Sequence, residues 1–120
     1  MVDSSGWIEY LTEGPLAGRF ARYIEGREEL VASSIQVYEL YKVIRRDVSE
    51  EQALQATAAL RRATIVPVDE ALALEAADVS LVSRLAMADA IIYATAKRAG
   101  AKLVTRDADF DGMPDVVLVT

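Results

Sequence analysis

The stretch between residues 85 and 110 constrains the fold more than any other part of the sequence. It combines an apolar helical pattern, a glycine-centred turn and a short buried strand at residues 101–105. Asp89 lies near the start of the helix, and Asp107 and Asp109 follow the strand directly. Because open α/β sheets bind ligands at the carboxyl ends of their strands, this unit predicts carboxylates at one edge of a parallel sheet.

Short apolar strands alternate with helical stretches along the rest of the chain. Further strands are predicted at residues 1–3, 30–32, 64–68 and 116–119, and further helices at 7–11, 16–26, 35–46, 50–62 and 70–82. This alternation indicates βαβ units, which build a parallel sheet with helices on both faces. We therefore predict an α/β fold in a single domain over residues 1–120, a length that suits one domain.

Capping residues and apolar spacing predict the helix starts and their buried faces. Ser4 or Ser5 is expected to cap the first helix and Ser33 or Ser34 the third, because a serine hydroxyl accepts a backbone N–H bond there. Asp69 is expected to cap the helix that follows residue 68. The positions predicted to face inward are Leu16, Phe20, Tyr23, Ile24, Ile35, Val37, Leu40, Tyr41, Ile44, Leu54 and Leu60.

The absence of histidine and cysteine narrows the chemistry that this chain can perform. The usual zinc sites need these ligands, and Ser–His or Cys–His nucleophilic pairs need a histidine. Acid–base work must then fall to carboxylates, lysine, tyrosine or water activated by a metal. Ligation by oxygen alone favours Mg²⁺ or Mn²⁺, which are the predicted cofactors.

The acidic composition bears on partners and location. The net charge is −6 and the isoelectric point about 4.6. Taken alone, this argues against nucleic-acid binding, because phosphate contacts need Lys and Arg, but bound cations would cancel much of the charge of clustered acids. No apolar run approaches the ~18 residues of a membrane span and no signal-peptide pattern is present, so we expect a cytoplasmic protein without a membrane partner.

Each acid of the predicted site also has a structural interpretation. Asp3 and Asp107 can serve as turn or cap residues. Asp89 lies in the first turn of its helix, where the helix dipole favours negative charge. Glu39 lies in an apolar helical stretch, where a carboxylate needs a partner or a metal, and Lys42 is the alternative partner.

Neighbouring residues are open to the same two interpretations. Asp109 and Asp111 can belong to an ordinary solvated loop, and Arg106 is either a phosphate contact or a surface charge. Thr105, at the strand end, can hold a carboxylate or water through its hydroxyl, or be a β-branched strand residue. The set of acids is more informative than its members, because acids after strands and acids on the helices that follow strands can share one sheet edge. Metal-assisted phosphodiester hydrolysis needs such a geometry.

At these residues the chain resembles the PIN-domain nucleases, especially the VapC-like toxins of prokaryotic toxin–antitoxin pairs. The matching segments, in chain order, are VDSS at residues 2–5, Glu39, MADAII at residues 87–92 and LVTRDADF at residues 103–110. The resemblance covers nearly the whole chain. It implies a three-layer α/β/α sandwich with a central, mainly parallel sheet.

The resemblance also implies a Mg²⁺- or Mn²⁺-dependent endoribonuclease that hydrolyses RNA phosphodiester bonds, as the toxin of a type II toxin–antitoxin pair. It implies a homodimer and a cognate antitoxin as partners, beside the RNA substrate. Together with the residues discussed above, the predicted site comprises Asp3, Glu39, Asp89 and Asp107 as catalytic metal-binding acids, Asp109 as a further metal ligand, Ser4 and Thr105 as supporting residues, and Arg106 as a substrate contact.

Two other classes of function remain open at this point. A non-catalytic PIN-like interaction module would keep the fold and show no metal-dependent RNA cleavage. A phospho-acceptor signalling domain would also be α/β with clustered acids, but it needs an aspartate that takes up phosphate. Acids after the first and fourth strands, without an obvious acceptor after the third, make that class less favoured.

Overall fold

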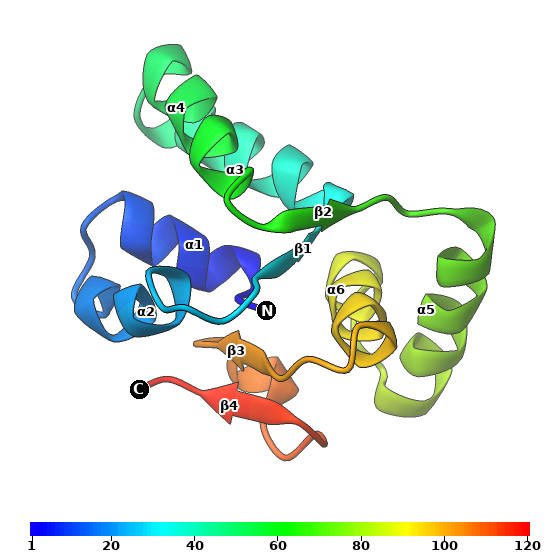
Figure 1. The fold of residues 1–120 in the computed structure, drawn as a ribbon. Coiled ribbons are helices and arrows are strands. Elements are labelled where there is room, and N and C mark those ends of the chain that lie inside the picture. The colour runs from blue at the N-terminus through cyan, green and yellow to red at the C-terminus, as the bar shows by residue number, and fades with distance from the viewer.

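The computed structural model describes residues 1–120, and its strands all pair in parallel. The elements in chain order are α1 (Ser4–Leu11), α2 (Ala17–Ile24), β1 (Val31–Ser33), α3 (Ser34–Asp47), α4 (Glu50–Leu60), β2 (Thr64–Val66), α5 (Glu70–Ser83), α6 (Met87–Arg98), β3 (Leu103–Thr105), the short 3₁₀ helix η1 (Ala108–Phe110) and β4 (Val116–Leu118) (Figure 1). Strand β1 pairs with β2, β3 pairs with β4, and Val2 forms one parallel bridge to Val104. The predicted α/β class with parallel strands is confirmed.

Alternation along the strands divides most of the hydrophobic core into two clusters, because successive strand side chains point to opposite faces. A third, smaller cluster lies between α3 and α4. Met1 and Leu103 belong to one cluster, whereas Val2 and Val104 belong to the other. Helices α5 and α6 contribute to the first cluster and α1 to α4 to the second. In Figure 1, α5 and α6 accordingly lie on one side of the strands, with the other four helices to the opposite side and above. The three-layer α/β/α arrangement follows from this division.

The buried Gln36 of α3 connects the N-terminal segment to β1, where no strand pairing joins them. Its Nε2 donates to the Val2 carbonyl at 2.9 Å, and its Oε1 accepts from the Ser33 N–H at 2.9 Å. A buried polar group left without a partner is costly, so these two bonds hold the N-terminal segment in register. The location of Asp3, the next residue after Val2, therefore depends on a side chain of α3.

One helix cap differs from the prediction. Asp3 caps α1 through a hydrogen bond from a backbone N–H of the first turn, so the prediction of Ser4 or Ser5 is wrong. An aspartate carboxylate accepts this bond as well as a serine hydroxyl does. Ser33 caps α3 and Asp69 caps α5, as predicted.

Two predicted inward residues are exposed instead. Tyr23 is 39% exposed and Leu54 is 55% exposed, whereas the other predicted inward positions are buried or partly buried. Helix α4 packs through the small residues Ala53 and Ala56, which form a buried cluster with Ile44 of α3. Leu54, one position after Ala53, is turned about 100° around the helix and points outward.

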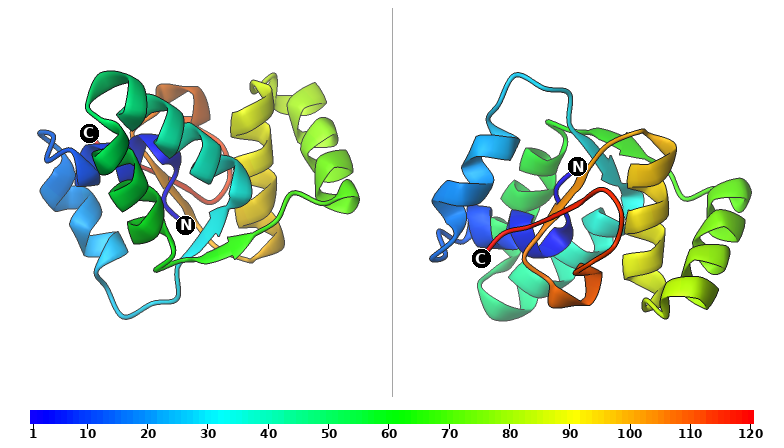
Figure 2. Two further views of the ribbon diagram at one scale, coloured as in Figure 1. Left: turned by 90° about the horizontal axis from the view of Figure 1, so that it is seen from above. Right: turned by 90° about the horizontal axis from the view of Figure 1, so that it is seen from below.

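Helices α5 and α6 form a pair at one end of the molecule (Figure 2). Gly100 ends the turn after α6 with a φ of +65°, a left-handed conformation that suits glycine. None of the helices is by itself long and apolar enough to cross a membrane. Only α5 and α6 taken together reach that length and composition, and the pair is bent by 112°.

Candidate metal centre

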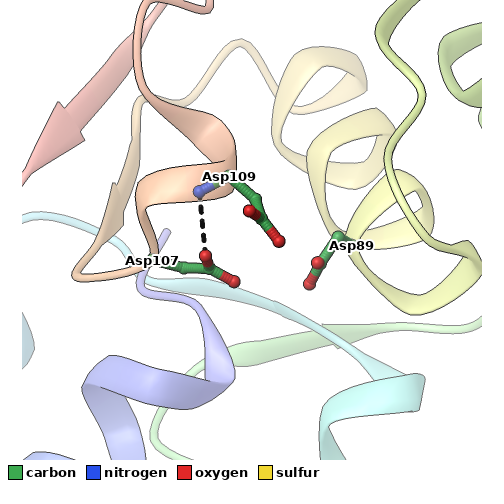
Figure 3. A group of neighbouring side chains, drawn as sticks. All are labelled: Asp89, Asp107 and Asp109. Atoms are coloured by element: carbon green, nitrogen blue, oxygen red, sulfur yellow. Dashed lines mark hydrogen bonds between the residues drawn. The ribbon is translucent and has the colours of Figure 1, made fainter.

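Three aspartates from two parts of the fold bring their carboxylates together. Asp89 lies in the first turn of α6, Asp107 follows β3, and Asp109 lies in η1. One carboxylate oxygen of each lies within 4.8 Å of the other two. Figure 3 shows the three side chains facing one another between α6 and η1. Asp109 is exposed and the other two are half-buried, so the cluster is reachable from solvent.

Hydrogen bonds within the loop after β3 orient the two acids that this loop carries. The backbone N–H of Asp107 donates to Thr105 Oγ1 at 2.9 Å. The backbone N–H of Asp109 donates to Asp107 Oδ1 at 2.9 Å, as Figure 3 shows, and this bond begins η1. Asp107 Oδ2 makes no hydrogen bond within the protein and remains available to a ligand.

Asp3 lies in the N-terminal segment, beside β3, and is only 3% exposed. Its backbone N–H donates to the Val104 carbonyl, and its Oδ2 accepts from Thr105 Oγ1 at 2.7 Å. Its Oδ1 accepts from Ser5 Oγ at 2.8 Å, in addition to the capping bond. Burial raises the pKa of Asp3, these hydrogen bonds offset part of the increase, and the charge of Asp107 adds to it. Thr105 therefore joins Asp3 to the loop of Asp107.

Glu39 is held by the start of α1 rather than by a basic side chain. Ser4 Oγ donates to Glu39 Oε1 at 2.6 Å. Lys42, the alternative partner, lies over the ring of Tyr38 and donates to its hydroxyl at 3.3 Å. The salt-bridge interpretation of Glu39 is therefore wrong, and its Oε2 makes no hydrogen bond within the protein.

The five acids influence one another electrostatically. The pKa of Asp89 is raised from 3.8 to about 6, first by burial and then by the charges of Asp107, Glu39, Asp3 and Asp109. None of the five forms an ion pair, although the protein has five salt bridges elsewhere. Carboxylates gathered without a basic partner disfavour their own ionisation, and a bound cation would relieve that repulsion.

This donor set fits a hard divalent cation. Every available ligand atom is a carboxylate oxygen, which suits Mg²⁺ or Mn²⁺. Asp89, Asp107 and Asp109 are the residues whose oxygens converge, whereas Asp3 and Glu39 lie outside that group but contribute to its charge. The large cavities lie elsewhere: one of about 610 Å³ is lined by residues of α5, α6 and the segment before β4. The acids form an open surface site rather than a deep pocket.

The sequence patterns did not single out Glu9 and Gln36, two residues that bear on the site. Arg106 is paired with the buried Glu9, whose Oε2 accepts from Arg106 Nη1 at 2.7 Å. Gln36 forms a capping box with Ser33 in addition to holding the N-terminal segment. The signals were present: Glu9 is a carboxylate within an apolar helical stretch, and Ser33 and Gln36 have capping-box spacing.

The acid cluster lies in a parallel α/β/α fold, and this fold carries acids at the carboxyl ends of its strands. The family model of the PIN domain matches residues 1–116. The chain belongs to the PIN domain family. A search of curated proteins gave no significant match.

Several solved structures share the fold over almost the entire chain. A toxin–antitoxin complex from Klebsiella pneumoniae has a TM-score of 0.77 at 24% identity, with 97% of this chain and 93% of that chain covered. VapBC2 from Rickettsia felis, bound to a DNA fragment from its promoter, has a TM-score of 0.76 at 17% identity, with 99% and 96% covered. VapC20 from Mycobacterium tuberculosis, a toxin that cleaves the sarcin–ricin loop, has a TM-score of 0.74 at 20% identity, with 92% and 89% covered. At these identities the likeness shows the fold.

Proposed function

We propose that this protein is a metal-dependent endoribonuclease that hydrolyses RNA phosphodiester bonds, and that it acts as the toxin of a type II toxin–antitoxin pair. The observation that carries the proposal is the convergence of Asp89, Asp107 and Asp109 within 4.8 Å without a basic partner. Membership of the PIN domain family supports it. The structural neighbours add support, because one of them is a toxin that cleaves the sarcin–ricin loop.

Each acid has a role in this proposal. Asp89, Asp107 and Asp109 hold Mg²⁺ or Mn²⁺, and Asp3 and Glu39 complete the acidic surroundings that attract the ion. When bound, the ion supplies positive charge that stabilises the charge developing on the phosphodiester. The unbonded Oε2 of Glu39 is an acceptor that can orient a water molecule toward the phosphorus. Water rather than the 2′-hydroxyl is the nucleophile, so the products carry a 5′-phosphate and a 3′-hydroxyl.

The proposal includes a homodimer of this protein and a cognate antitoxin as its partner. Each protomer is one domain spanning residues 1–120, and the protein acts in the cytoplasm. Two of the structural neighbours are complexes of a toxin with its antitoxin. Leu81, Val82 and Met87 are 74% exposed or more, all close to the turn between α5 and α6. Exposed apolar side chains gathered in this way are typical of protein interfaces. A monomer mass in light scattering at high micromolar concentration would contradict the homodimer.

A cleavage assay on a mixed RNA pool tests the enzymatic part. We expect cleavage with Mg²⁺ or Mn²⁺, none in a chelator, and no requirement for zinc. Asp89→Asn should reduce the rate by about 100-fold or more, because it removes a charged ligand atom from the site. Asp78→Asn is the matched control, because Asp78 is an exposed acid of α5 away from the cluster. Full cleavage in the chelator would exclude the metal mechanism.

A non-catalytic PIN-like interaction module is the second candidate. The net charge of −6 favours it, because RNA phosphates are bound by Lys and Arg. This candidate predicts no cleavage of any RNA with either metal, while the fold remains intact. The same assay therefore separates the two candidates.

A further inference from the structure

Glu9 is a buried carboxylate that the proposed chemistry does not use. It is 7% exposed, and a buried charge is costly unless it has partners. Its Oε1 accepts from the Leu16 N–H at 2.9 Å, and its Oε2 is paired with Arg106. The missing side chain of Gly14 leaves room for the carboxylate, since a Cβ there would collide with it. Glu9 is thus held by the Leu16 N–H in addition to its ion pair with Arg106, in space that Gly14 leaves open.

Arg106 lies between Thr105 and Asp107, in the loop that carries two acids of the candidate metal centre. Its guanidinium is half-exposed, whereas the side chain of Glu9 is 9% exposed, so the more rigid partner is Glu9. The ion pair ties the loop after β3 to α1, the helix that Asp3 caps. This ion pair fastens the loop to a helix whose contacting residue is 97 positions away in the sequence.

We propose that Glu9 and Arg106 are positioning residues of the metal centre. The pair holds the loop so that Asp107 and Asp109 face Asp89, and neither residue touches the ion. This inference rests on the proposed function, because it takes the acid cluster to be a metal site. A guanidinium already committed to a buried carboxylate has less charge to offer a phosphate, which favours positioning over substrate contact for Arg106.

Removing either partner should loosen the loop. Without Arg106, the buried charge of Glu9 loses its only ionic partner. Without the Glu9 charge, Arg106 loses the carboxylate that holds its side chain in place. Residues that orient metal ligands without touching the metal typically affect affinity by 10- to 100-fold. We expect the change at this site to lie near the lower limit, about 10-fold, because the bond that Thr105 donates to Asp3 and the bond that it accepts from the Asp107 N–H still hold part of the loop.

Mn²⁺ binding to the purified, metal-free protein tests the inference by titration calorimetry, with no dependence on cleavage. Arg106→Met and Glu9→Gln should each weaken Mn²⁺ binding about 10-fold. The double variant should bind Mn²⁺ no more weakly than the single variant with the lower affinity, because the two residues act as one unit. Arg106→Lys keeps a cation for Glu9 and should restore part of the affinity. Arg46→Met is the matched control, since it removes an exposed ion pair on α3.

Amide hydrogen exchange gives a second measurement on the metal-free protein. The N–H of Asp109, bonded to Asp107 Oδ1, should exchange faster in Arg106→Met than in Arg46→Met. If Arg106→Met unfolds, the comparison uses Arg106→Lys, whose affinity should lie below that of wild type.

The outcomes separate this inference from the function on which it rests. Wild type that fails to bind Mn²⁺ overturns the proposed metal site and the inference together. Wild type that binds Mn²⁺, with variants that bind it equally well, overturns the inference alone. A substrate role for Arg106 would give another pattern. Arg106→Met would then leave Mn²⁺ binding intact and, when added to the Asp89→Asn variant, would weaken RNA binding without metal. That result also overturns the inference.

Discussion

Replacing Asp89 by asparagine tests whether the fold holds its acids together against their mutual repulsion. In the metal-free protein, burial first and the neighbouring carboxylates second raise the pKa of Asp89 from 3.8 to about 6. That difference corresponds to about 3 kcal/mol against the charged form. Solvent screening reduces the effect, because the side chain is only half-buried. We therefore expect Asp89→Asn to increase the free energy of unfolding by about 1–2 kcal/mol at neutral pH.

The pH dependence of this gain has a definite sign. Well below the ordinary carboxyl pKa of 3.8, the carboxyl is protonated in the folded and unfolded states alike, so wild type and variant should be about equally stable. Between about pH 4 and about pH 6, the folded state holds the proton more tightly, and wild-type stability falls as the pH rises. Above this range the loss is complete. The advantage of the variant should therefore appear through this interval and then level off.

Urea denaturation in a chelator, repeated from about pH 4 to about pH 8, measures the effect directly. Added Mn²⁺ should then stabilise wild type more than the variant, because binding to the folded state is what stabilises it. Asp78→Asn should show neither the gain nor the altered response to metal. A loss of stability in the chelator, on the order of the 3 kcal/mol expected for a broken buried salt bridge, would refute the reasoning.

Three further substitutions test what supports the site and the fold, each by the free energy of unfolding in urea. Asp3→Ala removes the acceptor of three hydrogen bonds, one of which caps α1, and should cost about 1–3 kcal/mol. Gln36→Leu leaves two buried backbone groups unpaired and should cost about 2 kcal/mol or more; an unchanged value would mean that the N-terminal segment is held otherwise. Gly6→Ala would press a methyl group against Phe20 and should cost about 1–3 kcal/mol, whereas Gly18→Ala, with open space around it, should stabilise by about 0.5–1 kcal/mol. Equal values for the two glycine variants would contradict the packing.

Local patterns predicted the order and type of most elements, but the strand predicted at residues 1–3 is observed only as the single bridge between Val2 and Val104. The strand predicted at residues 101–105 is observed as Leu103–Thr105, and that predicted at residues 64–68 as Thr64–Val66. Apolar periodicity and caps act over one or two turns, so they are readable without tertiary contacts. Strand ends are less readable, because a strand lasts only as long as a neighbouring strand pairs with it.

Burial of single side chains was harder to predict. Leu54 has the same apolar character as Leu60, yet only Leu60 is buried. The difference depends on how closely α3 and α4 approach through Ala53 and Ala56, a feature of the packed pair and not of α4 alone. The cap of α1 was mispredicted for a related reason, since Asp3, Ser4 and Ser5 are all suitable capping residues.

The sequence by itself determined the fold class, the oxygen-only chemistry and the acids that merit attention, because composition and short-range periodicity are properties of the chain. Only the tertiary structure decided which acids converge. It brought Asp107 and Asp109 to Asp89, and left Glu39 with Ser4 instead of Lys42. Hydrogen bonds and charge interactions act over a few ångströms of space, and folding alone sets which residues, 35 or 97 positions apart, come within that range.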